Sequence, residues 1–495
     1  MEEQTTTLQH STGPRQGGDA LGALLDKVLL LCRRRSEIGI AQREAILNAR
    51  QCTARLLRLC VEPKLLHLLR STPPNLVRGA VAEVDTELQN AAAEVYGLRL
   101  DQEEHHLQLS LPVRAGGFGV GSLSLRHEAA YVGSWAHCLK PVLERLPHAD
   151  AEALRQALLE SDTAHPVSSR ILAATEALQN AGVPSAKLPN WELCAANQRR
   201  KAQRDFTKAR AEALRQELLR ASQDAARIRS CGGIGAGAFL LGPAGEGTTE
   251  LLDGVFSHSC AWRLGQDTTA PGRACQIGCH RRGGRCGEAL DRKGNHSVTC
   301  KYGGHKTIRH SRLVLSLRNI LRESGTAVVG REVPVSAWRR ADGTGARLDI
   351  SYSTGGVASY IDLTVRHPLA AKYRARAARE DGAAAKIAEN AKRIRYPAVA
   401  AAGLLPAEPF AVETFGRLGP AALKLLHSAR QRRVEADASL RGWAGCALFQ
   451  RWLAVLSVSL QQSLFESAQA AWGASSDSDS ACLLAACLPF EGMQF

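Results

Sequence analysis

Aromatic side chains are scarce in this chain. Phe, Trp and Tyr make up 5% of its 495 residues, and the apolar content consists mainly of Ala and Leu. A large all-β fold draws on aromatic and β-branched residues, whereas Ala and Leu favour helices. The composition therefore predicts a mostly helical protein, long enough for one to three domains with a sizeable core.

Long apolar runs and a secretory leader are also missing. The longest uncharged runs, Cys231–Gly245 and Trp452–Phe465, are shorter than the roughly 20 residues of a membrane span. The N-terminus begins Met-Glu-Glu, without the basic and apolar regions of a signal peptide. The 14 cysteines are too dispersed for a disulfide scaffold. These absences predict a protein without membrane contact in a reducing compartment, the cytosol or the nucleus.

Two catalytic patterns fail. Gly242–Thr249 resembles a phosphate-binding loop, but Thr248 stands where the loop needs Lys. The chain has no Asp-Asp dipeptide, so it lacks the paired carboxylates with which most reverse transcriptases add nucleotides. The formal net charge is +15 and the pI is about 9.4, which favours a polyanion, above all nucleic acid, as the partner.

Hydrophobic periodicity and Gly-rich breaks divide the chain into six segments. Residues 1–20 are predicted to be disordered. Residues 21–146 are predicted to be helical, with a break at Pro73-Pro74 and a short strand and turn over 107–123, and residues 147–250 are predicted to be helical as well. Residues 251–306 are predicted as a linker with a Cys/His cluster, residues 307–434 as a mixed α/β segment, and residues 435–495 as C-terminal helices with a tail. The predicted order in the mixed segment is a helix over 307–324, strands over 327–335, 346–353 and 357–365, a helix over 374–395, a strand over 409–414 and a helix over 418–434.

The Cys/His cluster predicts a structural zinc site. Thiolates and an imidazole at short spacing suit tetrahedral zinc, and the loop has few apolar residues that could fold it without a metal. The favoured ligands are Cys279, Cys286, His296 and Cys300, with Cys275 as the alternative to Cys279.

A pair of carboxylates is predicted on two neighbouring strands. If Gly355-Gly356 forms a two-residue hairpin turn, Thr354 pairs with Val357 and Asp349 falls opposite Asp362. Two like charges on one face of a strand pair repel each other, and a divalent cation such as Mg²⁺ relieves the conflict.

Further groups could complete this site. Glu332 lies on the preceding strand, while Lys392 and Tyr396 share a helical face with Glu389. A Lys beside a scissile phosphate would stabilise the developing negative charge. Residues 301–345 carry nine Lys/Arg against three Asp/Glu, and residues 371–433 carry thirteen against five. This surrounding charge favours a phosphodiester substrate.

Several motifs resemble the C-terminal part of non-LTR retrotransposon polyproteins that carry a restriction-enzyme-like endonuclease. CGEALDRKGNHSVTC resembles the zinc knuckle of that family, IRHSRL its Arg-His-Asn motif, RLDI…IDLTV the core of the PD-(D/E)xK nucleases, and KRIRY its Lys-x-x-Lys-Tyr motif. The resemblance covers residues 40 to 470 more weakly, beginning after the polymerase palm, so that 21–146 resembles a thumb and 147–250 the following linker.

The resemblance implies a helical N-terminal half, a zinc knuckle and an αβββαβ restriction-endonuclease-like domain over 307–434. It implies a Mg²⁺-dependent endonuclease that nicks target DNA to prime reverse transcription. The implied catalytic residues are Asp349, Asp362 and Lys392, assisted by Glu332. The residues implied to contact nucleic acid are Arg309, His310, Arg312, Arg395 and Tyr396.

The implied partners are DNA, the element's RNA and a separate reverse transcriptase chain, in the nucleus after synthesis in the cytoplasm. The sequence departs from the nuclease pattern at Leu348, where the family has Pro, and at Thr364, where a D-x-K motif has Lys. Catalysis would then depend on Lys392, with Lys386 as the alternative. The competing hypothesis is a catalytically inert remnant that binds nucleic acid.

Overall fold

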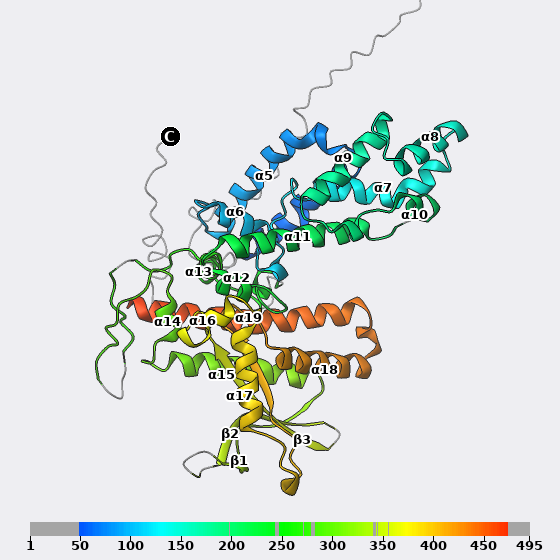
Figure 1. The fold of residues 1–495 in the computed structure, drawn as a ribbon. Coiled ribbons are helices and arrows are strands. Elements are labelled where there is room, and N and C mark those ends of the chain that lie inside the picture. The colour runs from blue at the N-terminus through cyan, green and yellow to red at the C-terminus, as the bar shows by residue number, and fades with distance from the viewer. Residues whose placement is uncertain are drawn as a thin grey trace, which may run out of the picture.

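The computed structural model describes residues 49–473, except for residues 198, 243–246, 271, 279–282, 340–342, 344 and 355. The segment predicted to be disordered, 1–20, lies outside the described residues. Up to Leu264 the described chain is helical, in agreement with the composition (Figure 1). Its α-helices are α3 (Ala49–Leu56), α4 (Glu62–Ser71), α5 (Pro74–Tyr96), α6 (Glu103–Ser110), α7 (His127–Leu143), α8 (His148–Leu159), α9 (Pro166–Asn180), α10 (Trp191–Ala196), α11 (Ala202–Ala221), α12 (Ala225–Cys231) and α13 (Asp253–Leu264).

The predicted break at Pro73-Pro74 is confirmed. Pro74 is the first residue of α5, where the missing N–H of proline costs nothing. The helix ends at Gly97, whose left-handed backbone (φ 68°) lets the N–H groups of Gly97 and Leu98 bond to the last turn. The two ends of α5 are therefore set by local sequence.

The strand predicted at the start of 107–123 is wrong. Residues 103–110 form α6, because Leu107 and Leu111 lie four residues apart and pack with Leu214 and Leu218 of α11. Apolar and polar residues also alternate over 107–111, so this short segment is compatible with the period of a strand as well as with that of a helix. The predicted turn does follow: a Cβ on Gly117 would lie 2.1 Å from the carbonyl oxygen of Leu111, and only glycine fits there.

The remaining chain combines helices with one four-stranded sheet. Its elements are α14 (Asn295–Thr299), α15 (His305–Glu323), β1 (Ala327–Arg339), β2 (Gly345–Thr354), β3 (Val357–Arg366), α16 (Ala371–Ala377), α17 (Ala383–Arg395), β4 (Glu408–Glu413), α18 (Pro420–Ala436) and α19 (Trp443–Trp472). The strand order is β1-β2-β3-β4; β1, β2 and β3 pair antiparallel, and β4 pairs parallel to β3. The predicted order of helix, three strands, helix, strand and helix is confirmed, except that two helices, α16 and α17, stand between β3 and β4.

Helices cover both faces of the sheet. One face packs on α15, α18 and α19 through a large apolar cluster that includes Ile361, Leu363 and Phe410. The other face carries α17, where Ala385 and Ala388 pack on Ala411 of β4. Small side chains on both sides of this contact bring α17 close to the sheet.

The helix predicted over 374–395 is interrupted. It is two helices, α16 and α17, separated at residues 378–382. Gly382 has a left-handed backbone (φ 71°), and Asp381 points to three arginines described below. The break therefore combines a local turn at Gly382 with contacts to residues far away in the sequence.

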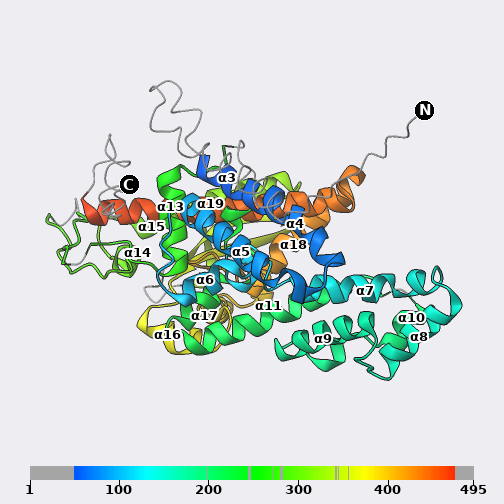
Figure 2. The same cartoon turned by 90° about the horizontal axis from the view of Figure 1, so that it is seen from above.

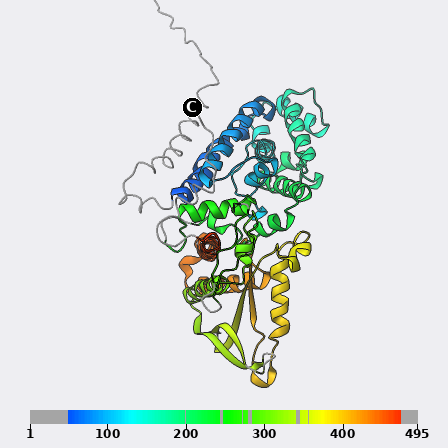
Figure 3. The same cartoon turned by 90° about the vertical axis from the view of Figure 1, so that its left-hand side faces the viewer.

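The C-terminal helix α19 is the centre of the molecule. Figure 3 shows it end-on between the N-terminal helices and the sheet. Its side chains take part in the apolar clusters of both parts, through Phe465 on one side and Trp452 on the other. By length and composition alone α19 could cross a membrane, but half of its most apolar window is buried within the protein. These clusters also cross the predicted segment boundaries at 250 and 434.

Asp381 joins the N-terminal helices to the α/β part. Its carboxylate accepts hydrogen bonds from Arg215 Nη2 and Arg229 Nη1 at 2.8 Å each, and from Arg417 Nη2 at 3.3 Å. Burial opposes ionisation of Asp381, but the attraction of these arginines, led by Arg417, holds its pKa below the ordinary value. The ionised carboxylate thus fixes three elements at the start of α17.

We expect Asp381→Asn to lower the free energy of unfolding at pH 7 by about 1–2 kcal/mol. This is less than for a fully buried pair, because a third of the Asp381 side chain is exposed. A lowered pKa stabilises the fold above the unfolded-state value of about 3.9, so the difference from wild type should disappear as the pH falls below about 4. Urea unfolding at several pH values measures it. Glu380→Gln, which breaks only more exposed pairs with Arg376 and Lys386, should change stability much less than Asp381→Asn does. Equal effects of the two variants would contradict the role of Asp381.

Candidate active site and metal centre

The β2–β3 hairpin brings the two predicted carboxylates together. Thr354 pairs with Val357 and Ile350 with Ile361, as the two-residue turn predicts. This pairing ends at Ile350 and Ile361, the chain neighbours of Asp349 and Asp362. There the carboxylate of Asp349 takes part in the strand pairing: its Oδ2 accepts a hydrogen bond from the Leu363 N–H at 2.7 Å. Burial is the main cause that raises the pKa of Asp362, and the charge of the nearby Asp349 raises it further.

Lys392 reaches this pair from α17. Its Nζ donates a hydrogen bond of 2.6 Å to Asp362 Oδ2, and the side chains are 19% and 9% exposed. Burial raises the pKa of Asp362 above its ordinary value, and the ammonium of Lys392 works against this. Thr364, at the D-x-K position, is buried on the same strand. The cation therefore comes from the helix and not from the strand.

His310 completes the group from α15. Its Nε2 donates to Asp349 Oδ2 and to the Leu363 carbonyl, each at 3.2 Å. The hydrogen bond to Asp349 raises the pKa of His310, which favours the cationic imidazole. Two carboxylates, an ammonium and an imidazole thus meet from three elements. The cluster is partly open, since a third of the His310 side chain is exposed.

Glu332 is not held in this cluster. Its residue pairs in register with the position of Asp349, but its backbone has a positive φ of 53° and its side chain is half exposed. The carboxylate lies 3.6 Å from Arg347 Nη2, and no hydrogen bond or ion pair given for the described residues joins it to Asp349, Asp362 or Lys392. The predicted assistance by Glu332 therefore has no support in the geometry.

Two of the predicted nucleic-acid contacts lie at the end of α17. Tyr396 is 4% exposed and packs with Trp338 and Leu348 in a small apolar cluster, so it anchors the helix end. Its burial corrects the prediction that it faces the nucleic acid. Arg395 is exposed, with its guanidinium 5.4 Å from the centre of the Tyr396 ring. Arg395 therefore stays available beside Lys392.

The other three lie on α15; besides His310, described above, they are Arg309 and Arg312, which both have structural partners. Arg309 is 3% exposed and donates to the Val298 carbonyl at 2.9 Å; burial lowers its pKa to about 10. Arg312 donates to Glu466 of α19 at 2.6 Å, and both side chains are 41% exposed. In the structure Arg309 joins α14 to α15, and Arg312 joins α15 to α19. Both arginines therefore hold helices together.

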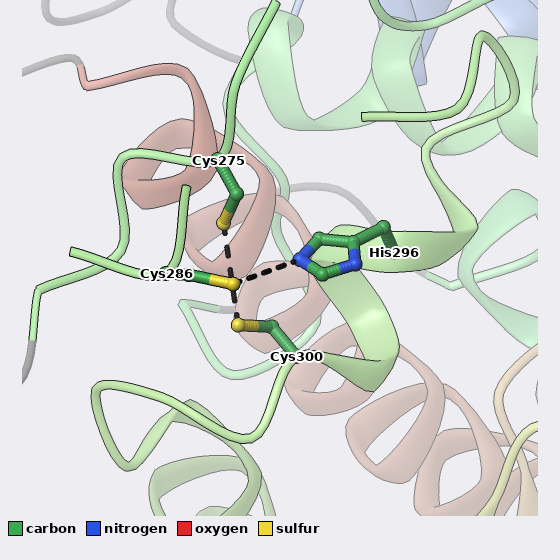
Figure 4. A group of neighbouring side chains, drawn as sticks. All are labelled: Cys275, Cys286, His296 and Cys300. Atoms are coloured by element: carbon green, nitrogen blue, oxygen red, sulfur yellow. Dashed lines mark hydrogen bonds between the residues drawn. The ribbon is translucent and has the colours of Figure 1, made fainter. Parts of the chain in front are cut away.

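A second cluster contains four metal-ligand side chains. Figure 4 shows Cys275, Cys286, His296 and Cys300 converging on one point, and their ligand atoms all lie within 4.8 Å of one another. The Sγ atoms of Cys275 and Cys300 are 4.0 Å apart, and Cys286 Sγ is 3.5 Å from His296 Nε2. Ligands about 2.0–2.3 Å from a tetrahedral zinc are separated by roughly these distances.

The surrounding groups orient these ligands. His296 Nδ1 lies 3.2 Å from Glu288, which leaves Nε2 toward the cluster. Asp291 accepts from the His296 N–H and so fixes the first turn of α14. The Tyr302 N–H donates to Cys300 Sγ at 3.5 Å. Glu288 was missed from the sequence, where its only signal is its place two residues after Cys286.

The donor set fits zinc. Three thiols and one imidazole are a ligand set of structural zinc sites, and burial raises the pKa of the Cys275 thiol to about 12, which disfavours a thiolate without a cation. Cys275 was the alternative to Cys279 in the sequence prediction, and the geometry includes it. Cys279 lies outside the described residues.

Comparison of the chain with models of known protein families finds no match, and comparison with curated proteins finds none.

We expect the purified chain to contain about one zinc per molecule and Cys275→Ser to lose it, because the site then keeps three ligands. Metal analysis after gel filtration measures the stoichiometry. Cys279→Ser is the matched control and should retain zinc. If Cys275→Ser keeps its zinc and Cys279→Ser loses it, the ligand is Cys279. If both variants keep their zinc, the proposed site is wrong.

Proposed function

We propose that this chain is a metal-dependent DNA endonuclease with a restriction-endonuclease-like αβββαβ domain, as part of a non-LTR retrotransposon protein. The observation that carries the proposal is the group formed by Asp349, Asp362 and Lys392. Two carboxylates on adjacent strands, with an ammonium 2.6 Å from one of them, suit metal-assisted hydrolysis of a phosphodiester.

Each residue has a separate role in this proposal. Asp349 and Asp362 would hold Mg²⁺, which would activate a water and neutralise charge on the phosphate when bound. Lys392 stabilises the negative charge that develops on the phosphate oxygens. His310 holds the Asp349 carboxylate through its Nε2 hydrogen bond and adds positive charge beside the substrate. Arg395, exposed at the end of the same helix, contacts the backbone.

The geometry also separates Lys392 from its alternative. Lys386 is engaged with Glu380 at 2.8 Å, on the side of α17 near Asp381. Glu389 is buried and accepts from the N–H groups of Ala421 and Ala422 at the start of α18. Among the described contacts neither residue touches the carboxylate pair, which supports Lys392 as the lysine of the proposed reaction.

The wider setting follows from charge and from the sequence resemblance. The basic segments around the site favour DNA, and the basic chain favours the element's RNA as a second ligand. Zinc, held by Cys275, Cys286, His296 and Cys300, would have a structural role. A nuclear location, nicking that primes reverse transcription and a separate reverse transcriptase chain belong to the same proposal.

The competing function is a nucleic-acid-binding protein without nuclease activity. Thr364 at the D-x-K position favours it, as does the direct pairing of Lys392 with Asp362. In this alternative the ion pair is a structural substitute for a metal. The two functions differ in metal-dependent cleavage.

The nuclease proposal is tested with the full chain, supercoiled plasmid and Mg²⁺ or Mn²⁺. We expect metal-dependent nicking, and Asp362→Asn should reduce its rate at least about 100-fold because a metal ligand is lost. DNA affinity should stay equal or rise, because the variant removes a negative charge. Fluorescence anisotropy measures that affinity.

Glu332→Gln is the matched control and should nick at close to the wild-type rate, since Glu332 faces Arg347. Nicking that persists in Asp362→Asn would overturn the assignment of the site. Salt-sensitive DNA binding without any nicking by wild type would establish the competing function.

A further inference from the structure

A large basic cleft lies away from the carboxylate site. It has a volume of about 1120 Å³ and lies against α4, α7 and α11, reaching Asp381 and Arg417 of the α/β part. Figure 2 shows α7 and α11 side by side and α16 and α17 near the other end of α11. Ten of the lining residues are Lys or Arg and two are Asp or Glu. The cleft is therefore strongly cationic.

The two acidic residues do not neutralise it. Asp381 is held by Arg215, Arg229 and Arg417, and Glu212 lies 3.6 Å from Arg215 Nη1. Three guanidinium groups and two carboxylates leave a net positive charge at this end. The rest of the cationic lining adds to it.

Five of the eight remaining cations, residues 199–201, 204 and 208, lie just before α11 or on its first turns. Arg200, Lys201 and Lys208 are exposed, and none has an acidic partner among the described residues. Arg204 is also exposed, with a loose contact of 3.9 Å to Asp205. Arg204 and Lys208 lie about one turn apart on α11, and Arg200 lies just before the helix begins at Ala202. These three residues place positive charge along one side of the cleft.

The floor of the cleft is made of small residues. Gly133 of α7 lies so close to Gln203 of α11 that a Cβ would be 2.6 Å from the Gln203 backbone, and Ser134 and Ala202 line the cleft beside them. Close packing of these helices leaves room above the floor. An open space with a small-residue floor and cationic walls suits the backbone of a polyanion.

The lining favours a duplex over a single strand. None of the described residues that line the cleft is Phe, Tyr or Trp. Single strands are held chiefly by stacking of their bases on aromatic rings, whereas a duplex keeps its bases inside and offers its phosphates. Lys and Arg without a stacking surface predict binding that does not depend on base sequence.

The cleft has a fixed relation to the proposed active site. Asp381 precedes α17, and Lys392 follows ten residues after Gly382 on that helix. At 1.5 Å per residue the separation is roughly 15 Å, which equals about four to five base pairs of B-DNA. A duplex in contact with Lys392 could therefore extend to the cleft.

We propose that this cleft binds the phosphate backbone of the DNA duplex that flanks the nicked position. The proposal rests on the nuclease function proposed above. It adds a binding site on the N-terminal helices that holds the substrate without reading its bases.

Binding is measured by fluorescence anisotropy with a 30-base-pair duplex and its single strand at several salt concentrations. The full chain carries Asp362→Asn in every case, so that no cleavage occurs. The triple variant Arg200→Glu, Arg204→Glu, Lys208→Glu should lose duplex affinity at least about tenfold near 150 mM salt. The slope of log affinity against log salt should fall by about 2–3, because three phosphate contacts are lost.

The matched control is Arg145→Glu, Lys187→Glu, Arg220→Glu. It makes the same charge change at exposed residues of the N-terminal helices that do not line the cleft. Its duplex affinity should fall by less than about threefold. Equal losses in both triple variants, or a loss confined to the single strand, would overturn the proposal. The neutral variant Arg200→Gln, Arg204→Gln, Lys208→Gln should show an intermediate loss, and wild-type affinity in it would also contradict the site.

Nicking separates this proposal from the one on which it rests. With Asp362 intact, the charge-reversed cleft variant should nick a 30-base-pair duplex more slowly but a 10-base-pair duplex at the wild-type rate. Equal slowing of both would place the effect at the catalytic site and contradict the cleft. If wild type never nicks, the nuclease function fails, while the anisotropy comparison still decides whether the cleft binds a duplex.

Discussion

The packing of α15 against α19 is the contact on which the proposed site depends. The two helices run antiparallel and are joined along their length. Ser316 bonds to Ser459 at 2.8 Å, and Glu323 accepts from the indole N–H of Trp452 at 2.8 Å. Trp452 is fully buried between them. Because α19 needs apolar cover on several sides, α15 has one stable position, and His310 on α15 then reaches Asp349.

The candidate metal centre is connected to α15 as well. Cys300 precedes α15 by five residues, and Arg309 of α15 donates to the Val298 carbonyl in α14. The Gln276 N–H donates to the Ala471 carbonyl, which attaches the cluster to the end of α19. A metal held by Cys300 would therefore fix the start of α15 and its packing on α19. The zinc site would thus act on the carboxylate site without direct contact, because α15 connects the two.

The parts of the structure that were predictable are set by local geometry. The hairpin register followed from one two-residue turn and a period of two, and it placed Asp349 and Asp362 at neighbouring positions. The choice of Lys392 came from the resemblance of KRIRY to a known motif, and helical periodicity alone would not have separated it from Lys386. The break before α17 has a local signal, Asp381-Gly382, but the partners of Asp381 could not be predicted, since Arg215 is 166 residues away.

The errors concern burial. A motif gives residue types, but the accessibility of Arg309 and Tyr396 depends on what packs around them. Both are charged or polar at one end, and both were expected to face nucleic acid, yet the fold covers them. The cationic cleft, in contrast, was not predicted from the sequence, because its residues come from several helices and no single motif contains them. Only the close approach of α7 and α11 makes them one surface.

The ion pairs around Asp381 explain how such a surface can also be a stable contact between parts of the protein. Three buried or half-buried guanidinium groups would be unfavourable together without a counter-charge. Asp381 supplies one negative charge, enough to satisfy their nearest donors but not to cancel three positive charges. Glu212, 3.6 Å from Arg215, supplies a second negative charge, so one net positive charge remains at this end of the cleft, which Arg215 and Arg417 line directly. The contact that orients α17, and with it Lys392, therefore also supplies positive potential for a phosphate backbone.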